Sequence, residues 1–276
     1  MRAGPGPMLV ALLLITGCVA DQPIQSAAPT APTLAASVMS DAVVAREVEQ
    51  LRAALLRDVP QYAIGNADDG RQWIERARAA TGAARLPIDR PQLLVVVDRN
   101  PAVQQLRIIL AQRDGRWQVI GGSKVSTGQA GRRAYFITPV GVFLHTDDIL
   151  DYRALGTFNE NHIRGLGLKG MRVWDFGWQS AARGWRVERD EAEIRLLMHA
   201  TDPDYLEQRL GRPASQGCVR IPAAMNRFLD MHGVLDADYE RAARDDARFR
   251  AVLLPAREPT ALAGNAMVVI DSSPGS

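Results

Sequence analysis

The chain has 276 residues, enough for one large domain or two small ones. Hydrophobic residues make up 47% and charged residues 23%, the ordinary composition of a soluble globular protein. The formal net charge of +2 gives no electrostatic indication of nucleic-acid binding, so we expect no nucleic-acid partner.

Residues 1–18 have the pattern of an export signal. Arg2 precedes the apolar run Met8–Ile15, which is too short to span a bilayer and is typical of a signal-peptide core. The sequence Ile15-Thr16-Gly17-Cys18 resembles a bacterial lipobox, which implies cleavage before Cys18 and its acylation. Because residue 19 is Val rather than Asp, we expect a periplasmic protein anchored by lipid in the outer rather than the inner membrane. The alternative is an ordinary signal peptide with a chance cysteine.

Residues 19–40 are rich in Ala, Pro, Thr and Ser and predict a flexible linker. A helical pattern follows over Asp41–Asp58, where apolar residues recur at spacings of three and four, and Pro60 ends it. A second helix is predicted over Asp69–Ala80. We assign residues 41–90 to an N-terminal helical segment that packs on the main domain; the alternative is an interaction arm.

Residues 91–271 predict a mainly β domain with a few helices, an α+β fold, followed by a tail at 272–276. β-Branched and apolar runs predict strands, with Gly and Pro at the turns. The predicted strands are Leu93–Val97, Leu106–Leu110, Trp117–Ile120, Lys124–Gly128, Tyr135–Leu144, Ile194–Met198 and Met267–Ile270. Helices are predicted over Ala223–Met231 and Asp236–Phe249.

The chain has two cysteines, Cys18 and Cys218. If Cys18 is acylated, Cys218 has no partner within the chain. Exported compartments are oxidising, so a lone thiol there points to a function. The alternative is a buried and inert cysteine.

Candidate catalytic residues concentrate at His199 and in Ser215–Arg220. A thiol becomes a useful nucleophile when a nearby imidazole takes its proton, which gives Cys218 and His199 complementary roles. Gly217 permits a tight backbone whose amides can face a developing oxyanion. The charge of Arg220 favours a thiolate or an anionic group of a substrate.

Taken together, these residues resemble the catalytic domain of the L,D-transpeptidase family. The family pattern is a histidine at the end of a strand, a loop, then Ser/Thr-His-Gly-Cys, a variable residue and Arg or Asn. The matching residues here are His199, Ser215, Gly217, Cys218 and Arg220. Upstream, Val125–Gly128 and Thr138–Phe143 are similar to the family's strand pair. The resemblance covers residues 92–235.

The resemblance implies a β-sandwich with a long loop over the cleft, and peptidoglycan stem peptides as the substrate. In this family the cysteine attacks the L,D amide before a terminal D-alanine, forms a thioester and passes the acyl group to an amine; water as acceptor gives a carboxypeptidase. Cys218 is then the nucleophile and His199 the general base, then acid. The carbonyl of Ala200 orients His199, and the amides of Gly217 and Cys218 bind the oxyanion. No cofactor and no metal are expected.

One position departs from the family pattern. Gln216 stands where the family usually has histidine, next to Ser215. Glutamine donates hydrogen bonds but cannot titrate. We expect proton transfer to depend on His199, with Gln216 and Ser215 shaping the site.

The segment Thr146–Arg186 is long, Gly-rich and aromatic, and no clean period is found in it. Long loops inside compact domains are usually functional, so we expect this segment to cover the cleft. Arg172 and Trp174 are its predicted substrate-binding residues, with Trp178 as a further part of an apolar wall. The alternative is that these aromatic side chains form the core of the loop itself.

Two other functional classes remain open. A papain-like cell-wall peptidase shares the Cys and His residues, but there the cysteine precedes the histidine, and here only His232 follows Cys218. A catalytically weak, lipid-anchored peptidoglycan-binding protein is the non-enzymatic alternative, and Gln216 is the feature that supports it.

Overall fold

The computed structural model describes residue 1 and residues 39–60, 67–186 and 190–274. The predicted signal peptide with Cys18 lies outside the described residues, as does the predicted linker up to residue 38. The described residues from Met39 onward belong to one compact unit.

The first sheet has five strands in the order β3-β2-β1-β9-β4. Their bounds are Gln92–Asp98 for β1, Gln105–Ala111 for β2, Gln118–Lys124 for β3, Gly141–Leu144 for β4 and Ala266–Ile270 for β9. β1 pairs with β2 antiparallel and with β9 parallel, with Leu94 opposite Ala266. The first and last strands of the chain are therefore neighbours inside this sheet.

The second sheet has four strands in the order β5-β6-β7-β8. They span Tyr152–Arg153, Arg172–Ala182, Glu191–Ala200 and Val219–Ile221. β6 pairs antiparallel with β5 and β7, whereas β7 and β8 are parallel. The parallel pair sets the end of β7, which carries His199, beside the chain that follows Cys218.

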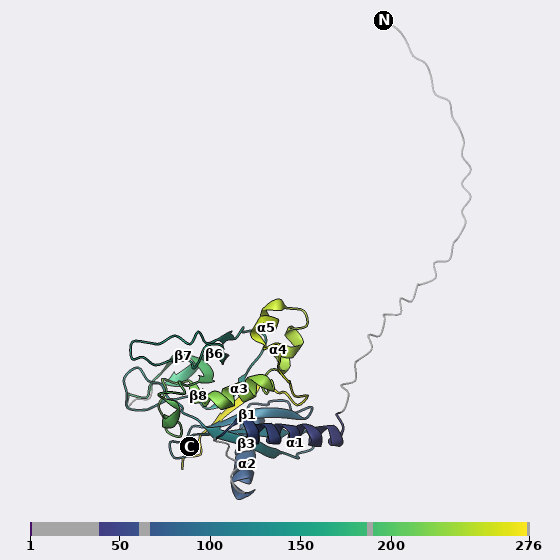
Figure 1. The fold of residues 1–276 in the computed structure, drawn as a ribbon, viewed down its shortest axis with the longest axis horizontal. Helices are drawn as coiled ribbons and strands as arrows, with labels where there is room; N and C mark the ends of the chain where they lie inside the picture. Colours follow the sequence, from purple (N-terminus) through teal and green to yellow (C-terminus); the bar gives the residue numbers. More distant parts are fainter. Residues whose placement is uncertain (2–38, 61–66, 187–189, 275–276) are drawn as a thin grey trace, which may run out of the picture. The chain divides into compact units, whose positions relative to one another are not determined.

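The two sheets share one core, which also takes in the helices α1 (Asp41–Asp58) and α3 (Ala223–Met231). Along β1 the side chains alternate between two cores, as the pleat of a strand requires. Leu93, Val95 and Val97 enter the shared core, and Leu94 and Val96 meet α2 (Ala67–Ala83) on the opposite face. In Figure 1, β6, β7 and β8 lie side by side, and α1 and α3 lie close to β1.

The predicted helices agree with the structure at α1 and α3 and differ near the C-terminus. α1 has the predicted bounds, and its buried stripe includes Val44, Val48 and Leu51. The helix predicted over Asp236–Phe249 is instead two short helices, α4 (Ala237–Ala242) and α5 (Ala247–Val252). The break has a local cause, because the side chain of Asp246 accepts the Arg248 amide and starts a new helix.

The predicted α+β class is confirmed: the described chain is mixed, with nine strands in two sheets and five α-helices. The strands predicted over Lys124–Gly128 and Tyr135–Leu144 are largely wrong. Residues 125–140 form only isolated bridges, and β4 begins at Gly141. Pro139 lacks the amide hydrogen that a paired strand uses. No helix within the described residues is long and apolar enough to cross a bilayer.

The prediction of one long loop over Thr146–Arg186 is wrong in its second half, which forms β6. This strand contains a bulge. Asp175 is opposite Leu197 and Trp178 is opposite Arg195, so two residues of β6 lie between these pairs but only one residue of β7 does. Gly177 occupies the bulge with φ of 77°, a conformation that favours glycine. The extra residue breaks the alternation of apolar and polar side chains, so periodicity in the sequence does not predict this strand.

Candidate active site

The segment Ser215–Arg220 is held by the two upstream stretches of the predicted strand pair. The backbones of Ser126 and Arg220 exchange two hydrogen bonds of 2.9 and 2.8 Å. The hydroxyl of Thr138 donates to the carbonyl of Gly217 at 2.7 Å and accepts the Gly128 amide at 2.8 Å. The stretches at 125–128 and 138 therefore form the floor under the cysteine loop.

Ser215 closes the turn that carries the cysteine. Its hydroxyl donates to the carbonyl of Cys218 at 2.6 Å and accepts the amide of Gly217 at 3.1 Å. Gly217 has φ of 131°, and a Cβ there would lie 2.8 Å from Cδ1 of Ile194. These hydrogen bonds are consistent with the site-shaping role predicted for Ser215. The prediction that the Gly217 amide binds an oxyanion is wrong for this structure, because that amide is already engaged.

His199 lies on β7, and Cys218 immediately precedes the adjacent strand β8. His199 is opposite Arg220 in the parallel pair β7–β8, and Cys218 precedes Arg220 by two residues. Paired residues and residues two apart in a strand share a face of the sheet. The face with His199 and Arg220 therefore also takes Cys218 at the entry to β8. The thiol is half-buried, and its Sγ lies 3.8 Å from the carbonyl of Arg195.

The imidazole of His199 is oriented by the neighbouring backbone. Its Nδ1 lies 2.7 Å from the carbonyl oxygen of Ala200, which can only accept. Nδ1 therefore carries the hydrogen, and Nε2 is left as the nitrogen that can take a proton. The contact is the one that the predicted role of Ala200 in orienting His199 requires.

The surroundings of His199 and Cys218 both favour the uncharged form. Burial, aided by the charge of Arg220 and opposed by the hydrogen bond to Ala200, lowers the pKa of His199 to about 4. Burial raises the pKa of Cys218, while the Leu197 amide and Arg220 oppose that rise. These shifts disfavour a thiolate paired with an imidazolium in the free site.

Four residues that the sequence did not assign to catalysis lie on the face of the sheet that carries His199: Tyr152, Asp175, Trp178 and Arg195. Tyr152 is opposite Val173, and Val173 is opposite His199, so the phenol is on the face of His199. Burial raises the pKa of Tyr152, and the charges of Asp175 and Cys218 raise it further.

The bulge at Gly177 decides where Trp178 lies. Without the extra residue, Trp178 would share the core face of Trp174. With it, Trp178 is opposite Arg195, is 62% exposed, and its ring centre lies 5.7 Å from Cζ of Arg195. The position of Trp178 fits the predicted apolar wall, which depends on a bulge that periodicity does not reveal.

Arg172 and Trp174 were predicted to bind substrate, and the structure contradicts this. Both side chains are 0% exposed and point to the face of the sheet opposite His199. Trp174 belongs to the core between the sheets. Arg172 is buried because it is paired with carboxylates, among them Asp151 at 2.8 Å and Asp236 at 3.3 Å.

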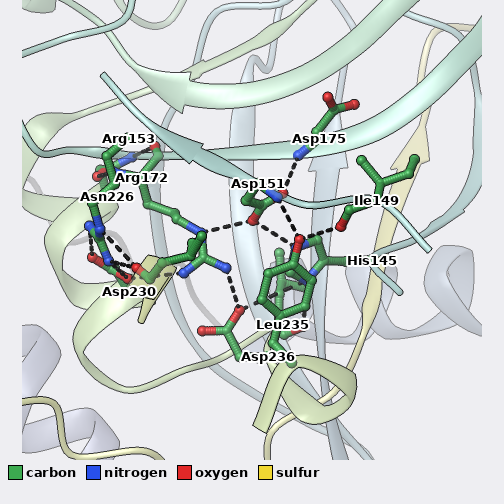
Figure 2. A network of polar contacts seen from close by, with 12 residues as sticks. His145, Ile149, Asp151, Arg153, Arg172, Asp175, Asn226, Asp230, Leu235 and Asp236 are labelled. Atoms are coloured by element: carbon green, nitrogen blue, oxygen red, sulfur yellow. Dashed lines mark hydrogen bonds and ion pairs between the residues drawn. The ribbon is translucent and has the colours of Figure 1, made fainter. Parts of the chain in front are cut away.

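Figure 2 shows the buried network around Arg172 and His145. His145 Nε2 lies 2.8 Å from Asp151, and its Nδ1 lies 2.9 Å from the carbonyl of Leu235. Both partners are acceptors, so both ring nitrogens carry hydrogens and His145 is an imidazolium. Although burial alone would lower the pKa of His145, the carboxylates of Asp151 and Asp236 hold it above its ordinary value.

The network extends to the site through Asp151. This carboxylate accepts Nε of Arg172 and Nε2 of His145 on one oxygen and the amide of Asp175 at 2.9 Å on the other. Although burial alone would raise the pKa of Asp151, His145 keeps it below its usual value. Asp151 thus fixes the backbone of Asp175 (Figure 2).

The first half of the predicted loop packs on the strands of the site. Leu166, Leu168 and Met171 belong to a small apolar cluster that includes Val173 and Ala200. The approach is close, since a Cβ at Gly167 would lie 2.7 Å from Cβ of Ala200. This part of the chain covers the end of β7 next to His199.

The remaining predicted site residues are placed as follows. Gln216 is exposed, and its side chain makes no hydrogen bond to the described residues. Arg220 is half-buried and donates to the carbonyl of Ala214 at 3.2 Å. Cys18 lies outside the described part of the chain. Within that part, no cluster of His, Cys, Asp and Glu is arranged to hold a metal ion.

Comparison with known proteins gives no family. No protein-family model and no curated protein matches the chain. Among solved structures, the helical cell shape determining protein Pgp2 from Campylobacter jejuni is similar, with a TM-score of 0.30 and 13% sequence identity. The match covers 67% of this chain and 48% of that chain, so this chain spans less than half of Pgp2. A likeness of this degree does not define a shared fold.

Proposed function

We propose that the chain is a peptidoglycan L,D-transpeptidase, an acyltransferase whose nucleophile is Cys218. The observation that carries the proposal is the register of the β7–β8 pair, in which Cys218, just before β8, shares a face of the sheet with a histidine of fixed tautomer. The resemblance of Ser215–Arg220 to the family pattern supports the same roles. The L,D-transpeptidase form of the α+β fold is part of this proposal.

The proposed reaction has two transfers. Sγ of Cys218 attacks the carbonyl carbon of the L,D amide while Nε2 of His199 takes the thiol proton. The carbon–nitrogen bond then breaks, His199 gives that proton to the departing amine of D-alanine, and a thioester remains. An acceptor amine next attacks the thioester and loses a proton to His199. The carbon–sulfur bond breaks, and the thiolate takes the proton back.

The neutral resting state supports a particular order of events. Because the pKa of His199 is lowered to about 4 and that of the thiol is raised, the proton moves during attack rather than before substrate binds. A bound peptide excludes water, which strengthens every polar interaction around the reacting atoms. Nε2 of His199 is the acceptor in this scheme, and Gln216 takes no part in proton transfer.

The cellular location is part of the proposal. Export and acylation of Cys18 would tether the domain to the membrane that borders the peptidoglycan layer. In a Gram-negative host, Cys18→Ala is expected to release the protein to the soluble fraction or to block its processing. An unacylated mature N-terminus at another residue would contradict the anchor.

The experiment that tests the activity is incubation of the chain from residue 19 onward with muropeptides, followed by mass analysis of the products. Cross-linked dimers or exchange of the terminal D-amino acid are expected from transfer to an amine. Trimming without transfer would indicate an L,D-carboxypeptidase. Binding of muropeptides without any change in their mass would favour the catalytically weak peptidoglycan-binding protein.

A further inference from the structure

Arg195 is the cationic side chain next to the proposed nucleophile that the mechanism leaves without a role. It lies on β7, four residues before His199, and shares its face of the sheet. Its backbone carbonyl is the group 3.8 Å from Sγ of Cys218. The side chain is 38% exposed, so a ligand at the thiol has access to it.

The guanidinium of Arg195 is anchored at one end. Both carboxylate oxygens of Asp175 lie near Nε, at 2.8 and 2.9 Å. The two terminal nitrogens have no hydrogen-bond partner among the described residues. Since a guanidinium presents its N–H groups in a rigid fork, the terminal pair remains available for a second carboxylate.

The anchor itself is rigid. Asp175 is 7% exposed; its amide donates to Asp151, and one of its oxygens accepts the amide of Gly177 at 2.9 Å. Asp151 is in turn fixed by the buried charges of His145 and Arg172 (Figure 2). The fork of Arg195 is therefore oriented before any ligand binds, which lowers the entropic cost of binding.

The charge balance around the thiol favours an anion. The charges of Arg220 and Asp175 both act on Cys218, and Asp175 is also the partner of Arg195 on the same face of the sheet. Arg220 pairs with no carboxylate among the described residues, and its buried Nε has no hydrogen-bond partner there. One positive charge is thus uncompensated beside the thiol, in a partly buried place where a carboxylate would be stabilised.

We infer that Arg195 determines specificity by binding a free carboxylate of the acyl donor close to the scissile amide. The inference rests on the proposed acyl transfer at Cys218. A stem peptide whose acyl-forming residue has a side-chain carboxylate offers two groups of this chemistry: that carboxylate and the C-terminal one of the departing D-alanine. Trp178 would form the apolar wall on one side of the bound group.

The test uses three tetrapeptides: one with both carboxylates, one with a C-terminal carboxamide, and one with an amidated side-chain carboxylate. Their binding is measured by calorimetry in Cys218→Ala protein, in which no thioester forms. One amidation is expected to weaken binding by roughly 10- to 100-fold, which identifies the carboxylate that Arg195 holds. Adding Arg195→Gln to the Cys218→Ala protein is expected to weaken binding of the unmodified peptide by a similar factor. The unmodified and amidated peptides are then expected to bind with equal affinity.

Two further variants keep the result interpretable. Arg195→Lys retains the ion pair with Asp175 without the fork and is expected to keep part of the discrimination. Arg113→Gln changes an exposed arginine of the loop after β2 and is expected to bind all three peptides normally. Unchanged discrimination in Arg195→Gln, or equal loss for all three peptides, would overturn the inference. If protein with the native Cys218 forms no thioester while the binding preference persists, the proposed acyl transfer is overturned and the role of Arg195 in binding is not.

Discussion

Ser215 and Cys218 are joined by a short hydrogen bond, with Oγ of Ser215 2.6 Å from the carbonyl oxygen of Cys218. The same hydroxyl accepts the amide of Gly217, so one side chain fixes both ends of the turn. Ser215 is fully buried, and water cannot replace these bonds. The direction of the thiol therefore depends on a hydroxyl that takes no part in the chemistry.

Ser215→Ala is expected to lower both stability and reactivity. It leaves a buried amide and a buried carbonyl without partners, which costs about 1–3 kcal/mol each. Ser215→Thr keeps the hydroxyl, so its stability and its acylation rate are expected to remain closer to those of the native protein. Urea unfolding and the rate of Cys218 acylation measure the two effects. Native rates and stability in Ser215→Ala would show that the turn is held by its backbone alone.

The division of roles between His199 and Gln216 gives a second prediction. Loss of a general base typically costs roughly 10²–10⁴ in rate, so His199→Ala is expected to lose about that much in acylation. Gln216 is exposed and makes no side-chain hydrogen bond to the described residues, so Gln216→Ala is expected to lose much less. Gln216→His is expected to be tolerated. Equal damage in Gln216→Ala and His199→Ala would contradict this division.

The pH dependence of the free thiol gives a third prediction. The reactive form is the thiolate, and burial raises the pKa of Cys218, so its alkylation by iodoacetamide is expected to keep accelerating from pH 5 to 9. A thiolate–imidazolium pair would instead give a plateau across neutral pH. That pair is not expected, since the pKa of His199 is lowered to about 4. Stopped alkylation followed by intact-mass analysis distinguishes the two profiles.

The parts of the fold that depend on local pattern could be predicted from the sequence. α1 follows from its apolar stripe and its Ser40 cap, and the strands β1 and β2 follow from apolar runs. The parallel pairing of β1 with β9 was not predictable, because nothing local relates Leu94 to Ala266. Long-range pairing is set by the packing of the whole core and not by propensity.

The site was predictable only where its residues are adjacent in sequence. His199, Ala200 and Ser215 were proposed because they match or adjoin the short motifs of the family that the sequence resembles. Arg172 was wrongly assigned to substrate binding because a charged residue is expected to be exposed. The carboxylates that allow its burial come from distant parts of the sequence and meet it only in the folded chain. Arg195 was missed because its relation to Cys218 depends on the register of two strands.

The buried imidazolium of His145 gives a fourth prediction, on stability. Asp151 and Asp236 raise the pKa of His145 in the folded state. A raised pKa contributes stability that is fully present below the unfolded value of about 6.5 and is lost as pH rises through the folded value. The free energy of unfolding is therefore expected to fall above about pH 6.5.

Two variants separate this effect from general pH sensitivity. His145→Gln removes the titrating group and is expected to flatten the decline, while lowering stability by about 3–5 kcal/mol because buried carboxylates lose their partner. The exposed His162 provides the matched control, and His162→Gln is expected to keep the native profile. Urea unfolding at a series of pH values makes the comparison. A native decline in His145→Gln would assign the pH dependence to another group.

The most direct test of the central claim is intact-mass analysis of the protein after incubation with a stem tetrapeptide that ends in D-alanine. The account predicts a mass increase equal to the peptide without its terminal D-alanine, localised to Cys218 and removed by an amine acceptor. Cys218→Ala is expected to show no adduct, with native unfolding behaviour. A native protein that forms no adduct, or an adduct that persists in Cys218→Ala, would contradict the account.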